Sequence, residues 1–130
     1  MTSKLVLDNI AGRTTAGSIA VVGEGNGTTT NLQQGLAKSW CNWATASSFS
    51  IYDSYNIASL TDNGAGNTKP VLTSVMNNDD YSYIGFSNET NYMGNNDERT
   101  TATFKLLSQN SSHSNTDCSD NNVAVHGDLA

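Results

Sequence analysis

The alternation of side chains over residues 49–59 constrains the fold of this chain more than any other feature. Apolar side chains share one parity, and small polar side chains occupy most of the other. A strand sends successive side chains to opposite faces, so this segment predicts a strand with one buried face. The apolar positions are Phe49, Ile51, Tyr55 and Ile57, with Asp53 between them. The Asn, Asp and Gly residues of 61–67 then predict a tight reversal into a strand over 69–76.

The composition also favours strands over helices. Only 14% of the 130 residues are charged and 36% are hydrophobic, and uncharged Ser, Thr, Asn and Gly make up most of the remainder. Such residues are poor formers of long helices. Turn signals separate six short segments, which we expect to be strands: 38–43, 49–59, 69–76, 80–87, 100–108 and 121–126. Short strands without helices between them predict an antiparallel β-sandwich over residues 36–130, with Trp40 and Tyr55 in its core.

Residues 1–35 have a different texture and predict an extended β arm. Two short strands are expected, one from Leu5 to Ile10 and one from 19 to 22. Residues 28–35 are expected to form a helical turn that a Thr or Asn caps and Gly35 ends. Strands this short bury too little area to offset their ordering entropy, so the arm must pack on its own domain or on other copies. The contact candidates are Leu5, Leu7, Ile10, Ile19 and Val21.

Charge and hydropathy exclude two kinds of partner. The net charge of −6 argues against nucleic acid, whose binding requires clustered Lys or Arg. Apolar runs are far shorter than the roughly 18 residues of a membrane span, so no membrane insertion is expected. The sequence therefore predicts a protein made in the cytosol and used there or within a larger assembly. Its two cysteines, Cys41 and Cys118, allow a disulfide by count, but two reduced and buried thiols are favoured.

Motifs for catalysis or metal binding are weak. The glycine-rich run 23–27 lacks the Lys-Ser/Thr that follows a phosphate loop, so a hinge is favoured. His113 and His126 have no nucleophile motif beside them. The acidic pairs at 79–80 and 97–98 lack the spacing of a calcium loop and are better interpreted as solvated turns. The sequence therefore predicts no catalytic, cofactor-binding or metal-binding residue, and no enzyme.

One long polar segment, residues 88–99, is predicted to be a surface loop. Tyr92 and Met93 lie within it. An aromatic side chain with a polar tip suits stacking on a sugar ring, although Tyr is also a common strand residue. These two residues are the candidates for contact with a receptor such as a host glycan.

Several runs together resemble a module found in bacteriophage virion proteins, frequent in the tail-fibre-like and receptor-binding proteins of marine and cyanobacterial phages. They are Leu36-Ala-Lys-Ser-Trp-Cys-Asn-Trp43, Ile51-Tyr-Asp-Ser-Tyr-Asn-Ile57, Thr61-Asp-Asn-Gly-Ala-Gly66 and Val123-Ala-Val-His-Gly127. Ser3-Lys-Leu-Val-Leu-Asp-Asn-Ile-Ala-Gly-Arg-Thr-Thr-Ala-Gly17 is similar to the opening of many fibre-like proteins. The likeness is weakest over residues 88–120, and Cys41, Trp43 and His126 depart from the usual pattern.

The resemblance implies a structural part of a virion that assembles as a homotrimer with other tail or capsid proteins. It brings no catalytic residues. Three roles stay open: a fibre or fibre-tip component for host attachment, a capsid decoration or head-fibre protein, and a glycan-binding tip that uses the 88–99 segment.

Overall fold

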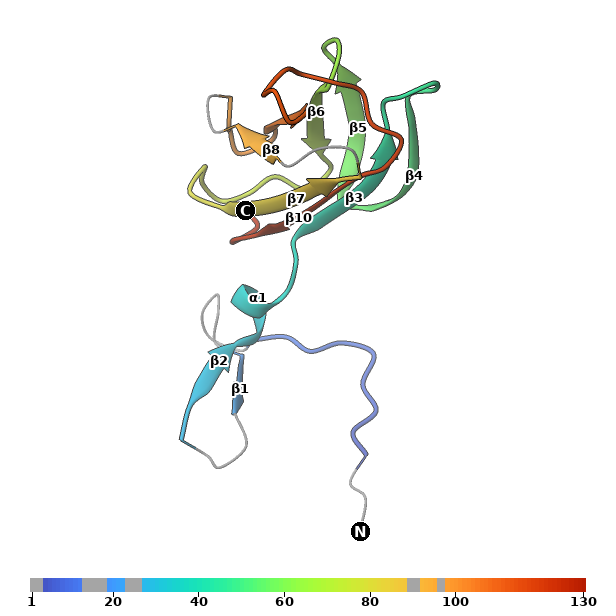
Figure 1. Cartoon of the computed structure of the whole chain (residues 1–130). Coiled ribbons are helices and arrows are strands. Elements are labelled where there is room, and N and C mark those ends of the chain that lie inside the picture. Colours follow the sequence, from blue (N-terminus) through green and yellow to red (C-terminus); the bar gives the residue numbers. More distant parts are fainter. Residues whose placement is uncertain (1–3, 13–18, 23–26, 89–91, 96–97) are drawn as a thin grey trace. The chain divides into compact units, whose positions relative to one another are not determined.

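The computed structural model describes residues 4–12, 19–22, 27–88, 92–95 and 98–130, with only the backbone of 92–95 (Figure 1). The chain divides into two compact units, Met1–Leu36 and Ala37–Ala130. The boundary expected from the sequence, between residues 35 and 36, lies one residue from this division. In the described part of the chain, every strand pairing is antiparallel and the helix is a single short turn. The fold is therefore nearly all β, as predicted.

The smaller unit contains a two-stranded sheet and a helical turn. Strands β1 (Ala20–Val22) and β2 (Thr29–Asn31) pair antiparallel, and α1 (Leu32–Gly35) follows directly. The side chain of Asn31 caps α1 by accepting the backbone N–H of Gln34 at 3.1 Å. The predicted second strand and the capped helical turn are therefore confirmed.

The predicted strand from Leu5 to Ile10 is wrong. Described residues 4–12 have exposed side chains and form no strand. Backbone N–H and C=O groups adopt a strand only when a second strand satisfies them. Alternating apolar residues supply a buried face, but they do not supply that second strand.

The larger unit consists of two four-stranded sheets. One has the order β4-β3-β10-β7 and the other the order β5-β6-β9-β8. Their strands are β3 (Ser39–Ala44), β4 (Ser50–Tyr55), β5 (Ile57–Asp62), β6 (Asn67–Leu72), β7 (Ser82–Ser87), β8 (Tyr92–Asn95), β9 (Lys105–Gln109) and β10 (Asn121–His126). Buried side chains of both sheets belong to one core, which makes the arrangement sandwich-like.

Residues 49–59 do not form the single strand that was predicted. The chain leaves the first sheet at the end of β4 and enters the second at the start of β5, with Asn56 alone between them. Asn56 has a φ of 57°, a left-handed backbone angle that turns the chain without a loop. An alternating pattern cannot reveal this corner, because alternation continues on both sides of it.

The hairpin that joins β5 to β6 is the reversal that the sequence predicted. Gly64 and Gly66 have positive φ angles of 103° and 60°, and the N–H of Asn67 donates to the carbonyl of Gly64 at 2.9 Å. Gly66 is also packed tightly. A Cβ built there would lie 2.6 Å from the backbone N of Thr116 and would also contact the carbonyl oxygen of Ser108. Only glycine fits this position.

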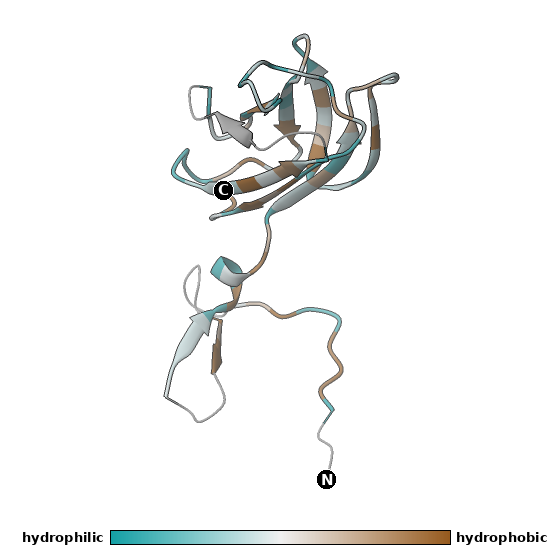
Figure 2. Ribbon diagram, viewed as in Figure 1, coloured by the Kyte–Doolittle hydropathy of each residue, from teal (hydrophilic) through white to brown (hydrophobic). Residues whose placement is uncertain are grey.

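The core lies between the two sheets. Its buried members are Cys41, Trp43, Leu72, Met76, Tyr81, Phe104, Leu106, Val123 and Val125. Figure 2 shows hydrophobic bands alternating with polar ones along the strands, as expected for sheets with one buried face. A buried polar side chain also spans the layers, since Asn121 of β10 accepts a hydrogen bond from Ser108 of β9 at 2.7 Å.

The prediction that Trp40 and Tyr55 are core residues is wrong. Their exposed fractions are 37% and 53%. On β3 the inward positions are Ser39, Cys41 and Trp43, so Trp40 points to the other face. Each face of this strand carries one tryptophan, so hydrophobicity alone does not show which face is buried.

Candidate interaction surface

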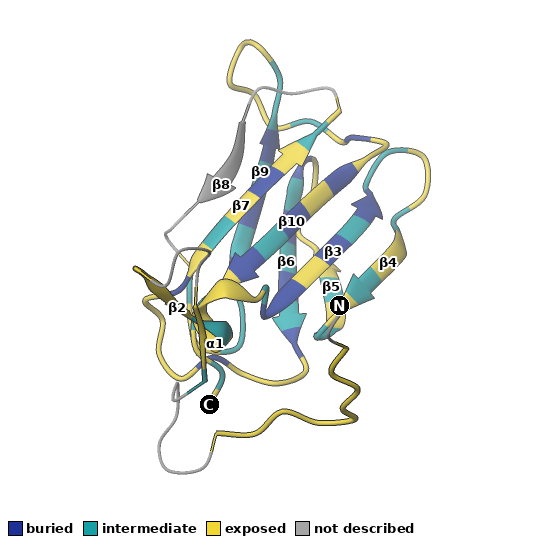
Figure 3. Ribbon diagram, turned by 90° about the horizontal axis from the view of Figure 1, so that it is seen from below, coloured by how far each residue is buried: buried dark blue, intermediate teal, exposed yellow. Residues whose placement is uncertain are grey.

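One row of side chains crosses all four strands of the sheet β4-β3-β10-β7. Tyr55 pairs with Trp40, Trp40 with Ala124, and Ala124 with Ile84. Directly paired residues in an antiparallel sheet share a face, and here it is the face away from the core. Phe86 lies two residues beyond Ile84 on β7 and therefore shares the same face. Figure 3 shows these strands side by side, with exposed segments on each of them and buried segments on β3, β10 and β7.

The large side chains of this row, and Phe86 beside it, are exposed. Ile84 is 59% exposed and Phe86 is 63% exposed, in addition to Trp40 and Tyr55. We call these four residues the outer apolar face. Isolated apolar residues are common on protein surfaces, but a contiguous group across a whole sheet marks an interaction site.

A second row, beside the first, is polar at three of its four positions. It runs from Asp53 through Asn42 and Asn122 to Phe86. The side-chain amide of Asn42 donates to Asp120 at 2.8 Å, which anchors the start of β10. This row forms a polar border along one side of the outer apolar face.

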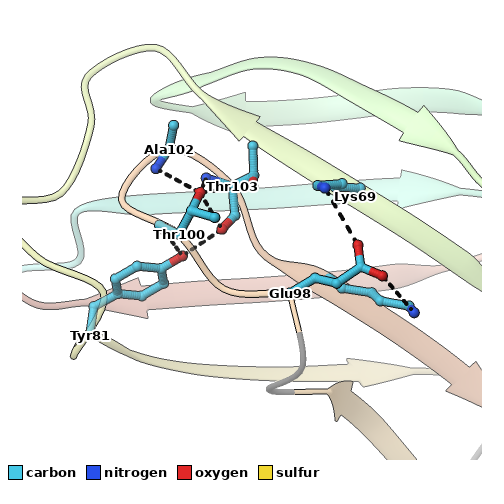
Figure 4. Close-up of polar contacts among 7 residues, drawn as sticks. Lys69, Tyr81, Glu98, Thr100, Ala102 and Thr103 are labelled. Atoms are coloured by element: carbon cyan, nitrogen blue, oxygen red, sulfur yellow. Dashed lines mark hydrogen bonds and ion pairs between the residues drawn. The ribbon is translucent and has the colours of Figure 1, made fainter.

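The opposite sheet presents a different outer face. Glu98 accepts hydrogen bonds from Lys105 at 3.1 Å and from Lys69 at 3.4 Å (Figure 4). The hydrogen bond from Lys105 is the main cause that lowers the pKa of the Glu98 carboxyl. Both lysines alternate with buried residues on β6 and β9, so they lie on the side away from the core. The two outer faces therefore differ in chemistry, one apolar and one ionic.

Tyr81 holds the loop that carries Glu98. Its hydroxyl donates toward the carbonyls of Thr100 and Thr103, at 2.9 and 3.0 Å, as Figure 4 shows. Arg99 donates to the Tyr81 carbonyl at 2.8 Å and lies 5.5 Å above its ring. Burial raises the pKa of Tyr81 to about 12. The loop is thus fixed from the core side, which keeps the carboxylate of Glu98 beside both lysines.

The contact candidates in residues 1–35 are exposed in this single chain, with one exception. The exposed fractions are 81% for Leu5, 53% for Leu7, 59% for Ile10 and 51% for Val21, whereas Ile19 is half-buried. Their proposed role as subunit contacts stays a prediction.

Tyr92 and Met93 lie in a strand, so the prediction that 88–99 is entirely loop is wrong. Their backbones pair with Gln109 and Ser108 of β9, in strand β8. Pairing to β9 overrides the polar, turn-like composition of this segment. Their side chains fall outside the described residues, and their receptor contact stays a prediction.

The two cysteines are buried free thiols, as the sequence indicated. Burial is the larger cause, and Asp53 the smaller, that raises the pKa of Cys41 to about 11. Within the described residues, no three His, Cys, Asp or Glu side chains gather as metal ligands would. In the same part of the chain, no helix has the length and apolar character to cross a membrane.

Sequence reasoning missed the outer apolar face. The signal is present at residues 81–86, just before and along β7, where Tyr81, Tyr83 and Gly85 alternate with Ile84 and Phe86. A strand with apolar side chains on both faces is predicted to be buried on both, or to be buried on one face and to contact a partner through the other.

Comparisons with known proteins add nothing further: no family model, curated protein sequence or solved structure significantly matches this chain.

Proposed function

We propose that this protein is a non-enzymatic structural subunit of a phage virion. Its place is in a fibre or fibre tip that takes part in host attachment, and it assembles there as a homotrimer. The observation that carries the proposal is the amount of exposed apolar surface on a single chain, in the segment 4–12 and on the outer apolar face. The resemblance of the sequence to fibre-like virion modules supports the same role.

Segment 4–12 supports an assembly role because it is apolar and has no partner of its own among the described residues. Leu5, Leu7 and Ile10 are each more than half exposed. Full burial of such a side chain contributes about 1.5–3 kcal/mol. Three copies that interleave these side chains would gain this contribution from every chain, whereas a lone arm cannot bury them.

Charge distribution supports the arm as the place where copies meet. Residues 1–36 carry two basic and two acidic side chains, so this unit is formally neutral. Residues 37–130 carry four basic and ten acidic side chains, which accounts for the whole net charge of −6. Identical arms can therefore approach one another without net repulsion, whereas the larger units repel unless a charge-poor face is turned inward.

Immunogold labelling of intact particles tests the virion role. Antibodies against this chain, applied to particles encoded by the same genome, should label fibres or fibre tips. Particles from a genome with the gene disrupted are the control. Labels on the capsid shell would favour the alternative of a decoration or head-fibre protein. Intact particles without labels would refute the virion proposal.

Removal of residues 1–30 tests the oligomer. We expect the shortened chain to associate more weakly while its larger unit stays folded, because the core lies wholly within residues 41–125. Light scattering measures the mass and far-UV circular dichroism measures the strand content. A full-length chain that is monomeric at micromolar concentration would contradict the proposed trimer.

A second candidate function is glycan recognition by the tip, and the position of β8 favours it. This strand is one of the two edge strands of its sheet and carries Tyr92 and Met93. Binding on a glycan array that disappears in Tyr92→Ala, but not in Tyr52→Ala, would support this function. An array without signal would leave the purely structural role.

A further inference from the structure

We infer that the outer apolar face of the sheet β4-β3-β10-β7 is buried against a second copy of this chain. The inference rests on the proposed role as an assembled subunit and deepens it, because it names the surface through which the larger units meet. That surface consists of Trp40, Tyr55, Ile84 and Phe86.

The size of the face suits a subunit contact. A large aromatic side chain can bury about 150–250 Å², and the exposed fractions of these four residues then correspond to roughly 450 Å² of apolar surface. A stable interface takes about 800 Å² from each partner, of which about 56–65% is apolar. The outer apolar face therefore supplies nearly all the apolar area that one standard interface needs. The polar border and β10 supply the remainder.

The charge of the face suits an identical partner. The two rows contain eight side chains, and Asp53, at the end of one row, is the only ionised one among them. When identical faces meet around a symmetry axis, a charged group close to the axis is brought toward its own copy. A face without central charges avoids this like-charge cost, although the unit as a whole is strongly acidic.

The chemistry favours a protein partner over a saccharide. Ile84 and Phe86 are the most exposed of the four residues, and neither has a polar tip. A sugar ring needs hydrogen-bonding groups beside the aromatic platform; the polar border offers such groups, but Asn42, one of its three polar residues, already donates its amide to Asp120. An apolar face with a polar border is the usual pattern of a subunit interface.

The two tryptophans provide a built-in test in the full-length protein. Trp43 is 1% exposed and should be insensitive to a quencher, so acrylamide quenching reports on Trp40. The inferred contact shields Trp40 at high protein concentration. On a roughly hundredfold dilution through the micromolar range, we expect the Trp40 quenching constant to rise at least about twofold. Trp40→Phe, which removes the reporter, should show no rise.

Variants locate the contact. Phe86→Asp should show the high quenching of the dilute protein at every concentration, together with a lower mass by light scattering. Val75→Asp is the matched control, because Val75 is an exposed apolar residue outside the face, and it should behave as the unmodified chain. Near-UV circular dichroism checks the fold of each variant. Phe86 is largely exposed, so its replacement leaves the core intact.

Several outcomes would overturn the inference. One is an oligomer whose Trp40 is quenched as strongly at every concentration as in the Phe86→Asp variant, which would mean that arms alone join the copies. A monomer at every concentration is another, and shielding of Trp40 by added oligosaccharide, in place of dilution dependence, is a third. The virion role is judged separately: unlabelled particles with a shielded Trp40 would refute that role alone, and labelled particles with an exposed Trp40 would refute this contact alone.

Discussion

Asn56, the single residue between the two sheets, should be one of the most sensitive positions in the larger unit. Its side-chain amide donates to the carbonyls of Lys38 at 2.9 Å and Ser74 at 3.0 Å, and its Oδ1 accepts the N–H of Ser74 at 2.7 Å. The residue therefore ties the entry of β3 to the segment after β6 while its own backbone turns the corner.

The expected loss for Asn56→Ala is about 3 kcal/mol of unfolding free energy. Both bonds to Ser74 are exposed, so water replaces them in part and each contributes about 0.5 kcal/mol. The partly buried bond to Lys38 contributes about 1 kcal/mol. Alanine also tolerates the left-handed backbone angle less well than Asn does, which costs roughly 1 kcal/mol more.

Comparison with Asn56→Gly separates the side chain from the backbone. Glycine loses the same three hydrogen bonds but adopts a φ of 57° without strain, so it should be less destabilised than Ala by about 0.5–1 kcal/mol. Asn56→Asp keeps the acceptor but turns a carboxylate toward two carbonyls. Its stability should therefore recover as pH falls and the carboxyl becomes protonated.

Urea unfolding, followed by the fluorescence of buried Trp43, measures these differences at one fixed protein concentration. The reasoning is refuted if Asn56→Gly is as unstable as Asn56→Ala, because the left-handed angle would then carry no cost. Losses below about 0.5 kcal/mol in both variants would show that water replaces all three hydrogen bonds.

Three further predictions concern the same unit. Gly66→Ala should lower the unfolding free energy by at least about 2 kcal/mol in urea, because its Cβ would meet the backbone of Ser108 at a positive φ; an unchanged midpoint would contradict this. The pKa of the Glu98 carboxyl is lowered in the folded state, chiefly by the hydrogen bond from Lys105, so Glu98 should stabilise the fold above its ordinary pKa of 4.5 and lose that effect as pH falls through the lower folded value. A difference in melting temperature between the unmodified chain and Glu98→Gln that persists at pH 2 would argue otherwise. Cys41, with a pKa raised by burial to about 11, should resist thiol reagents at pH 8 and react once urea unfolds the chain; equal rates in both states would disprove its burial.

The sequence predicted most strands because their local signals are strong. β3 and β10 lie within one residue of their expected bounds, and the Gly64–Gly66 reversal is placed correctly, since few residues other than glycine tolerate its angles. The cap at Asn31 is likewise a local event that a short-range pattern reveals.

What the sequence did not predict depends on tertiary partners. The corner at Asn56 interrupts neither hydrophobicity nor strand propensity, so 49–59 resembled one strand. β8 exists through its pairing with β9, which its polar composition does not announce. The outer apolar face was missed because Trp40 and Trp43 sit on opposite parities, and only the assembled sheet shows which of them faces the core.

The position of β10 has a consequence for biosynthesis. β3 and β7 do not pair with each other, because β10 lies between them and pairs with both. Trp43 and its partner Asn121 are 78 residues apart, so a ribosome must translate nearly the whole larger unit before this layer can close. Folding should therefore be slow and largely post-translational, and nascent chains would expose Trp43 and Tyr81 to chaperones in the meantime.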